Sequence, residues 1–149
     1  MENVITIRTA GLSDIQLAAQ LQLLLWPDHT LEEMKLEMGK VLASPDGVVF
    51  IATIGENLAG FAECRLRHDY VEGTHTSPVG YLEGIFVKPE YRRHGVARFL
   101  FQYCEKWAKD KGCSEFASDC ELINQASIEF HKDSGFQEVN RTVNFSKKI

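Results

Sequence analysis

Apolar residues recur along this chain with two different spacings, which predict where strands and helices form. Strand-like runs bounded by turn residues occupy residues 4–8, 48–53, 58–66, 81–87 and 115–119. Helical spacing occupies residues 13–25, 30–42, 96–111 and 124–134. Two closing strands are expected near residues 137–139 and 142–146. This order predicts an α/β fold with a mixed central sheet.

The expected helix ends carry residues with capping chemistry. Ser13 is followed by Gln16 and Thr30 by Glu33, which is the spacing of a capping box. In such a box each side chain accepts a hydrogen bond from the backbone of the other residue. In the helix from residue 96, a stripe of large side chains is expected to pack on the core: Val96, Phe99, Leu100, Tyr103 and Trp107.

The composition is that of an ordinary globular protein. The 149 residues are 44% hydrophobic and 25% charged, which suits one domain over residues 1–149. No membrane-length apolar run and no signal-peptide plan are present, so we expect a cytoplasmic protein with no membrane partner. The net charge of −5 argues against nucleic acid and suits a cationic substrate. The cysteines lack metal-binding spacing, so we expect no metal site and buried free thiols: Cys64, Cys104, Cys113 and Cys120.

A small-residue loop between the strand at 81–87 and the helix from 96 is the clearest chemical signal. It reads Arg92-x-x-Gly95-x-Ala97. Backbone N–H groups at a helix N-terminus converge on one point and attract anions, so this loop predicts a pyrophosphate site. The loop lacks the Gly-Lys-Ser/Thr of a P-loop and the three glycines of a dinucleotide fingerprint. The alternative is an ordinary strand–turn–helix whose glycine serves packing.

The strand before this loop contains one carboxylate, Glu83, among apolar residues. A carboxylate is costly to bury without a partner, and the adjacent Gly84 indicates a bulge. Glu83 is therefore a candidate for taking the proton from an attacking amine, directly or through water. The alternative is a structural glutamate that pairs with an arginine such as Arg65.

The loop and the segment 124–136 together resemble the GCN5-related N-acetyltransferase (GNAT) superfamily. The resemblance implies acetyl-CoA as co-substrate and a central sheet whose bulged fourth strand is splayed to admit the pantetheine arm. A tyrosine that often protonates the leaving thiolate is replaced here by His131. The cofactor-binding residues it implies are Ile85, Phe86, Val87, Arg93, His94, Gly95, Val96, Ala97, Arg98 and Asn124.

A closer resemblance rests on Leu25-Trp26-Pro27, on residues 67–73 and 77–79, and on Ala117-Ser118-Asp119. These segments look like those of the aminoglycoside 6'-N-acetyltransferases, and the similarity runs from end to end. It implies a homodimer and an aminoglycoside site lined by Trp26, Tyr70, Glu83 and Asp119. Some relatives carry a glutamate near the start of the last strand, where this chain has Asn140.

The expected reaction is direct transfer of the acetyl group of acetyl-CoA to the 6'-amino group of an aminoglycoside antibiotic, giving resistance. Carboxylates would bind the substrate's ammonium groups, and aromatic rings would offer stacking faces. No cysteine lies in a recognisable nucleophile setting, so a covalent intermediate is not expected. Two alternatives are an acetyltransferase for another cationic amine, such as a polyamine, and an acetyl-CoA-binding domain without turnover.

Overall fold

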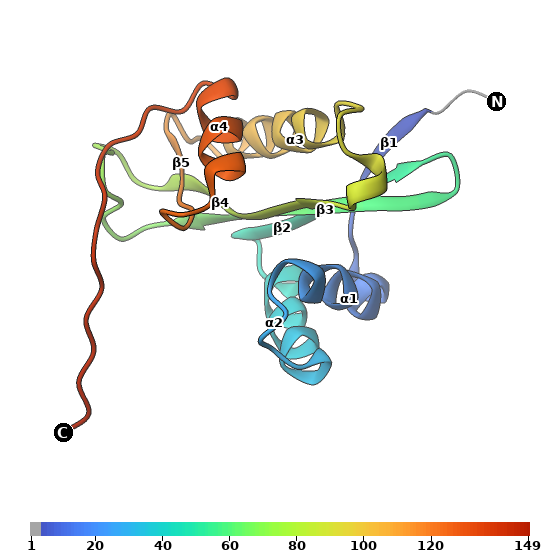
Figure 1. The fold of residues 1–149 in the computed structure, drawn as a ribbon, viewed down its shortest axis with the longest axis horizontal. Helices are drawn as coiled ribbons and strands as arrows, with labels where there is room; N and C mark the ends of the chain where they lie inside the picture. The colour runs from blue at the N-terminus through green and yellow to red at the C-terminus, as the bar shows by residue number, and fades with distance from the viewer. Residues whose placement is uncertain (1–3) are drawn as a thin grey trace.

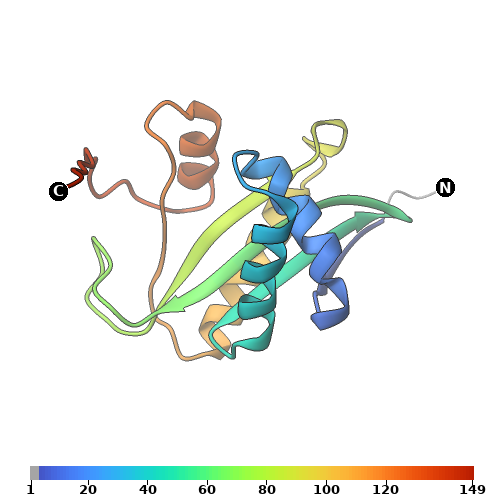
Figure 2. The ribbon, with the colours of Figure 1, turned by 90° about the horizontal axis from the view of Figure 1, so that it is seen from below.

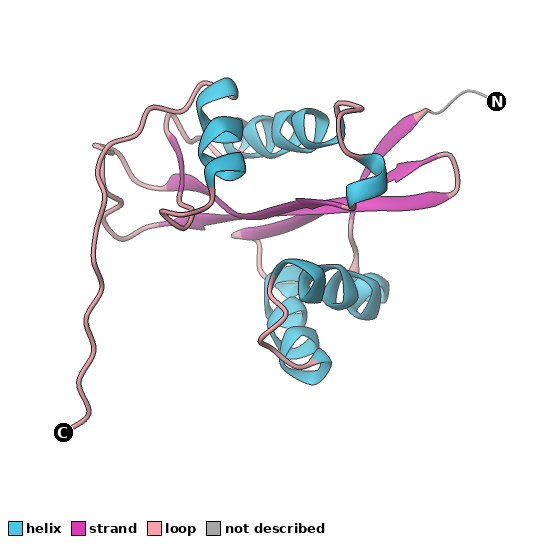
Figure 3. Cartoon of the chain, in the orientation of Figure 1, coloured by secondary structure: helices cyan, strands magenta, loops and turns pink. Residues whose placement is uncertain are grey.

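The computed structural model describes residues 4–149 and consists of one mixed sheet with helices on both faces (Figures 1 and 3). The sheet has five strands in the order β1-β2-β3-β4-β5; the first four are antiparallel neighbours and β5 runs parallel to β4. This is the predicted α/β architecture. The strands are β1 Ile5–Thr9, β2 Gly47–Ile54, β3 Asn57–Arg67, β4 Val79–Val87 and β5 Phe116–Ser118. The α-helices are α1 Ile15–Leu25, α2 Leu31–Ala43, α3 Val96–Asp110 and α4 Gln125–Asp133.

Two hydrophobic layers hold the helices to the sheet. Successive residues of β2 alternate between them: Val48 and Phe50 face the layer that contains α3, whereas Val49 and Ile51 face the layer that contains α1 and α2. Figure 2 shows α1 and α2 crossing one face of the sheet with α3 behind it. Both faces of the central strands are therefore buried.

The first predicted capping box is wrong and the second is confirmed at its cap. A short 3-10 turn, Leu12–Asp14, precedes α1, and the Asp14 carboxylate accepts from the Gly11 N–H at 2.8 Å. This bond is the reach-back contact of a box that begins at Gly11, the role that the pattern gave to Gln16, and no side-chain hydrogen bond caps α1 itself. Thr30 Oγ1 accepts from the Glu33 N–H at 3.2 Å and begins α2 as predicted.

The buried face of α3 is turned relative to the predicted stripe. Val96 and Leu100 are buried, but Phe99 is 41% and Tyr103 45% exposed. The remaining buried positions belong to residues that the stripe omitted: Phe101, Cys104 and Ala108. The helix packs this face on the sheet and leaves the aromatic side chains of Phe99 and Tyr103 at the margin of the contact.

A β-bulge lies in β4 at the predicted place. Glu63 of β3 pairs with Gly84 and the next residue, Cys64, pairs with Leu82, so Glu83 is the extra residue. Pairing of β4 with β5 also ends at Leu82. Beyond this point the chain after β5 turns away toward α4 (Figure 2), and β4 presents an open edge.

The two predicted closing strands do not form. Residues 136–149 contain no strand, and beyond Phe136 the chain runs away from the sheet (Figure 1). Strand-like alternation is present in this tail, but a strand needs hydrogen bonds from a neighbour, and the described chain provides none beside it. Phe136 itself packs on Phe101 and Phe116, with ring centroids 5.3 and 6.0 Å away.

Gly60 marks the closest approach of β3 to the bulged strand, and we predict that Gly60→Ala destabilises the fold. A Cβ there would lie 2.2 Å from the Phe86 carbonyl oxygen, a backbone atom that cannot rotate away. The expected cost is about 1–3 kcal/mol or more of unfolding free energy, measured by urea denaturation. Gly39→Ala is the control, because its nearest neighbour atom would be 3.9 Å away and alanine favours a helix interior. A Gly60→Ala protein as stable as wild type would contradict the close approach.

Candidate active site

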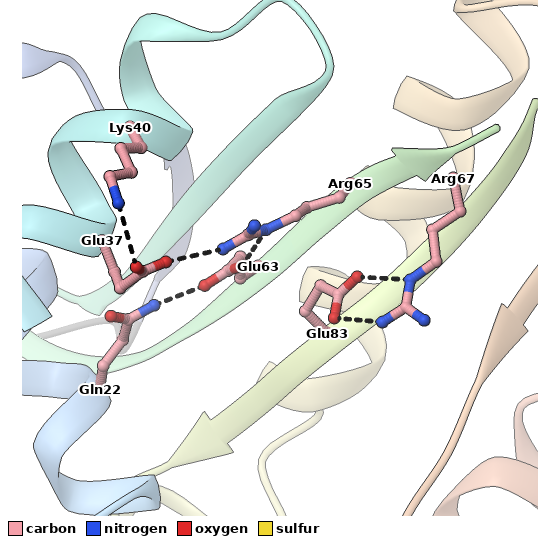
Figure 4. Close-up of polar contacts among 7 residues, drawn as sticks. All are labelled: Gln22, Glu37, Lys40, Glu63, Arg65, Arg67 and Glu83. Atoms are coloured by element: carbon pink, nitrogen blue, oxygen red, sulfur yellow. Dashed lines mark hydrogen bonds and ion pairs between the residues drawn. The ribbon is translucent and has the colours of Figure 1, made fainter. Parts of the chain in front are cut away.

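Glu83 projects from the bulge and is held by one arginine of β3. Arg67 Nε donates to Oε2 at 3.0 Å and Nη2 donates to Oε1 at 2.8 Å, a two-pronged ion pair (Figure 4). The side chains are 18% exposed for Glu83 and 43% for Arg67, so the pair is reachable from solvent. Glu83 thus has an arginine partner as the structural alternative required, but that partner is Arg67 and not Arg65.

The same guanidinium links Glu83 to the end of β5. Arg67 stacks over the Tyr81 ring, 3.5 Å from its centroid, and the Tyr81 hydroxyl donates to the Asp119 carboxylate. Burial and the hydrogen bond to Asp119 raise the pKa of Tyr81 well above its usual value, so the phenol keeps its proton. Glu83 raises the pKa of Arg67 through its side-chain hydrogen bond. Two predicted site carboxylates, Glu83 and Asp119, are therefore joined through two intervening side chains.

A second ion-pair network lies deeper under the helices, and the sequence reasoning missed it. Glu63 is 3% exposed; it accepts from Arg65 Nε at 2.8 Å and from Gln22 Nε2 at 2.5 Å (Figure 4). Arg65 also lies 3.8 Å from Glu37, which lies 3.6 Å from Lys40. Burial raises the pKa of Glu63 and Arg65 opposes the rise. The sequence signal that could have identified Glu63 is the one used for Glu83, a lone carboxylate in an apolar strand.

Trp26 touches the strand directly beside Glu83. Its indole packs edge-on against Phe61, with centroids 6.3 Å apart. A Cβ on Gly84 would lie 2.6 Å from the Trp26 ring, so only glycine lets the ring approach this closely. The structure therefore brings Trp26 and the bulge together, as the closer resemblance implied.

Tyr70 stands in the loop that follows β3 and is 76% exposed. A cleft of about 470 Å³ lies between this loop and β4, and its lining includes Tyr70, Asp69, Arg67 and Glu83. The neighbouring Val71 packs in a small buried cluster, which holds the loop in place. Further along, the Glu115 carboxylate accepts from the His75 N–H at 2.8 Å and from the Thr76 hydroxyl.

The predicted phosphate loop has the required backbone geometry. Arg93 and Gly95 have positive φ values of 67° and 85°, and Gly95 is the N-cap of α3. Arg92 Nε donates to the Val87 carbonyl at 2.8 Å, which ties the loop to the end of β4. The first backbone N–H groups of α3 have no partner within the helix, so they are available to an anion. The open edge of β4 at residues 85–87 leads to this point.

The comparison with known proteins decides the family. A sequence profile of the acetyltransferase (GNAT) family matches residues 18–136, which span the bulge, the loop and the Gly135-Phe136 motif. The chain belongs to the GNAT family. The family resemblance stated from the sequence is thereby confirmed, as is the α/β fold with a bulged fourth strand.

Relatives within the GNAT family match this chain along nearly its whole length. The chain is 46% identical to the aminoglycoside N(6')-acetyltransferase type 1 of Acinetobacter baumannii over 99% of both chains. It is 43% identical to that of Stenotrophomonas maltophilia, over 94% of this chain and 91% of the relative. The solved structure of aminoglycoside N-acetyltransferase AAC(6')-Iy in complex with CoA is similar with a TM-score of 0.94 and 34% identity, over 100% of this chain and 98% of that chain.

AAC(6')-Iy has also been solved with a bisubstrate analogue, CoA-S-monomethyl-acetylneamine. That structure is similar to this GNAT chain with a TM-score of 0.92 and 35% identity, over 98% of this chain and 99% of that chain. The analogue joins CoA to an aminoglycoside portion in one molecule.

Two residues of α4 are engaged within the protein. Asn124 caps the helix, its Oδ1 accepting from the Ser127 N–H at 3.1 Å. His131 Nδ1 lies 2.6 Å from the Ser127 carbonyl oxygen and Nε2 lies 2.8 Å from Ser118 Oγ. Nδ1 must therefore carry a proton, because a carbonyl oxygen can only accept. The ring fastens α4 to β5, on the far side of the splay from Glu83.

The cysteines differ from the prediction at one position. Cys64, Cys104 and Cys113 are buried free thiols as expected, whereas Cys120 is exposed. Burial raises the pKa of the Cys64 and Cys113 thiols, which keeps them protonated. In residues 4–149 no group of three or more His, Cys, Asp or Glu side chains is arranged to hold a metal ion, and no helix there is long and apolar enough to cross a membrane.

Proposed function

We propose that this GNAT protein transfers the acetyl group of acetyl-CoA to the 6'-amino group of aminoglycoside antibiotics, and that it thereby gives resistance in the cytoplasm. The observation that carries the proposal is the position of the Glu83 carboxylate. It lies at the bulge, between the open edge of β4 and a cleft lined by Tyr70 and Asp69. An ammonium bound there would be next to the strand edge that suits a thioester. The whole chain, residues 1–149, serves as one catalytic domain in this proposal.

Acetyl-CoA would lie along the splay. Its pyrophosphate would accept from the N–H groups of residues 93–98, favoured by the positive end of α3. Its pantetheine arm would pair with the open β4 edge at residues 85–87, as an added strand pairs with a sheet edge. Asn124 would contact the cofactor through its amide NH2 group, because its Oδ1 is used by the helix cap.

The aminoglycoside would occupy the acidic side of the bulge. Trp26 and Tyr70 would supply apolar faces, and Asp119 would accept from an ammonium in competition with the Tyr81 hydroxyl. Glu83 would receive the reacting amine, hold it against the thioester and take its proton. The amine then attacks the carbonyl carbon, the C–S bond breaks, and the second proton lost by the attacking nitrogen goes to the leaving thiolate or to solvent as CoA is released. The protonated state of the buried Cys64 and Cys113 thiols supports this direct route over an acetyl-cysteine intermediate.

Acetyl-CoA consumption tests the proposal, measured with kanamycin, with spermidine and with no acceptor. Efficient turnover of kanamycin at a submillimolar KM supports it, together with mass-spectrometric assignment of the acetyl group to the 6'-nitrogen. Faster turnover of spermidine would favour a polyamine acetyltransferase. Binding of acetyl-CoA without turnover of either amine would favour a cofactor-binding domain.

Gly95→Asp tests the cofactor site. The substitution places a negative charge where the pyrophosphate would bind, so we expect acetyl-CoA affinity measured by calorimetry to fall at least tenfold. Gly95→Asn is the matched control, because asparagine has the same shape and also tolerates the positive φ of this position. Equal dissociation constants for the two variants would contradict the site.

Glu83→Gln tests the proton acceptor. Glutamine keeps the volume and the hydrogen bonding of glutamate but loses its basicity, so kcat should fall by about 10²–10⁴-fold and its dependence on pH should change. Glu72→Gln, an exposed carboxylate of the neighbouring loop, is the control and should retain kcat. A rise in KM with unchanged kcat and pH dependence would restrict Glu83 to substrate binding.

We further propose that the protein is a homodimer whose interface includes the C-terminal tail. Val139, Val143 and Phe145 are 59%, 77% and 91% exposed, and they share one face of the extended segment. Sedimentation of the full chain should show a dimer, and Val143→Asp combined with Phe145→Asp should shift it to monomer. Thr142→Asp with Asn144→Asp adds the same charge on the alternate face and should leave the dimer intact. A wild-type monomer at micromolar concentration would refute this proposal.

A further inference from the structure

Both oxygens of the Glu83 carboxylate are already occupied by a cation that belongs to the protein. The Arg67 guanidinium bonds Oε1 and Oε2 at 2.8 and 3.0 Å. The fork uses the carboxylate lone pairs that point toward Arg67, and one outer lone pair on each oxygen remains. A substrate ammonium can take the position between the two oxygens only if the guanidinium moves aside.

The same guanidinium also covers the aromatic face next to Glu83. It lies 3.5 Å from the centroid of the Tyr81 ring, whose hydroxyl is engaged by Asp119. One arginine therefore covers both the carboxylate and the ring that a cationic amine would otherwise contact. A bound ammonium is also a cation, so it would favour the same position beside the Glu83 carboxylate and the Tyr81 ring.

The Arg67 pair can be broken at a lower cost than the pair of its neighbour Arg65. Its side chain is 43% exposed and borders the cleft of about 470 Å³. Arg65 is bound to Glu63, whose side chain is 4% exposed, and also lies near Glu37. Breaking the Arg65 pair would strand a buried carboxylate, whereas breaking the Arg67 pair leaves two groups that water or substrate can reach.

We infer that the Arg67 guanidinium occupies the place of the substrate ammonium beside Glu83 before substrate binds. The 6'-ammonium displaces this guanidinium from Glu83, so that binding is an exchange of cations. This inference rests on the proposed function. The exchange keeps a cation beside Glu83 before and after substrate binds. It also makes every amine compete with the guanidinium, whereas a ligand without an ammonium at this position leaves Arg67 in place. Arg67 is thus a specificity-determining residue that weakens binding of the group to be acetylated.

Two aminoglycosides that differ at one group provide the test. Neomycin carries an amino group at the 6' position and paromomycin a hydroxyl group. Arg67→Met keeps the length of the side chain and removes the charge. We expect it to lower the dissociation constant of neomycin by about three- to fivefold, the worth of a partly exposed ion pair, and to leave that of paromomycin unchanged. Both constants are measured by calorimetry.

The controls separate exchange from general effects of charge. Arg67→Lys keeps the charge without the fork, so its neomycin affinity should lie between those of wild type and Arg67→Met. Lys40→Met removes an exposed charge whose one ion-pair partner among residues 4–149 is Glu37, and it should change neither ligand's affinity by more than about twofold. Arg67→Gln repeats the measurement should the methionine variant lose thermal stability.

The outcomes distinguish this inference from the proposed function. A wild-type protein that acetylates neither neomycin nor kanamycin overturns the proposed function. If wild type acetylates neomycin but Arg67→Met binds it more weakly than wild type does, Arg67 helps to hold the substrate and the exchange is wrong. Equal tightening of neomycin and paromomycin also overturns the exchange, because it would mean a general relief of positive charge.

Discussion

One extra residue in β4 is the constraint on which the rest of the site depends. In a regular strand Glu83 and Gly84 would point to opposite faces of the sheet. The bulge at Glu83 turns both residues toward the same face. Pairing with β5 ends one residue earlier, at Leu82, so the sheet opens at the same point. The glycine admits the Trp26 ring and the open edge can pair with an extended ligand. Without the bulge, neither the carboxylate nor the edge would face a common space.

The charged groups on this face divide into a fixed pair and an exchangeable pair. Both pairs join a glutamate to an arginine of β3, and they differ mainly in burial. Glu63 is nearly inaccessible, and its contacts reach α1 through Gln22 and α2 through the Arg65–Glu37 contact. Such a pair is costly to break, because one buried charge would remain without a partner. The Arg67–Glu83 pair is reachable from solvent and is worth about 1 kcal/mol or less, so a ligand can compete with it.

The two halves of the proposed site are built from different ranges of the chain. Apart from Asn124, the proposed cofactor half is continuous in sequence, from the end of β4 through the loop to the first turn of α3. The substrate half combines α1, the loop after β3, β4 and the end of β5. Asp119 and Glu83 are 36 residues apart in the chain, yet they are connected through Tyr81 and Arg67. Changes in drug preference can therefore arise in several elements without disturbing the phosphate loop.

The sequence by itself determined the features that depend on neighbouring residues. These include the order of strands and helices through α4, the Thr30 cap and the bulge at Glu83–Gly84, because backbone geometry and hydrogen-bond capacity follow from residue type over a few positions. Only the tertiary structure decided which arginine meets Glu83, that Glu63 is buried, and which side chains of α3 touch the sheet. It also decided that residues 136–149 form no strand. Each of these depends on partners brought from distant positions, and a strand or an ion pair exists only where its partner is present.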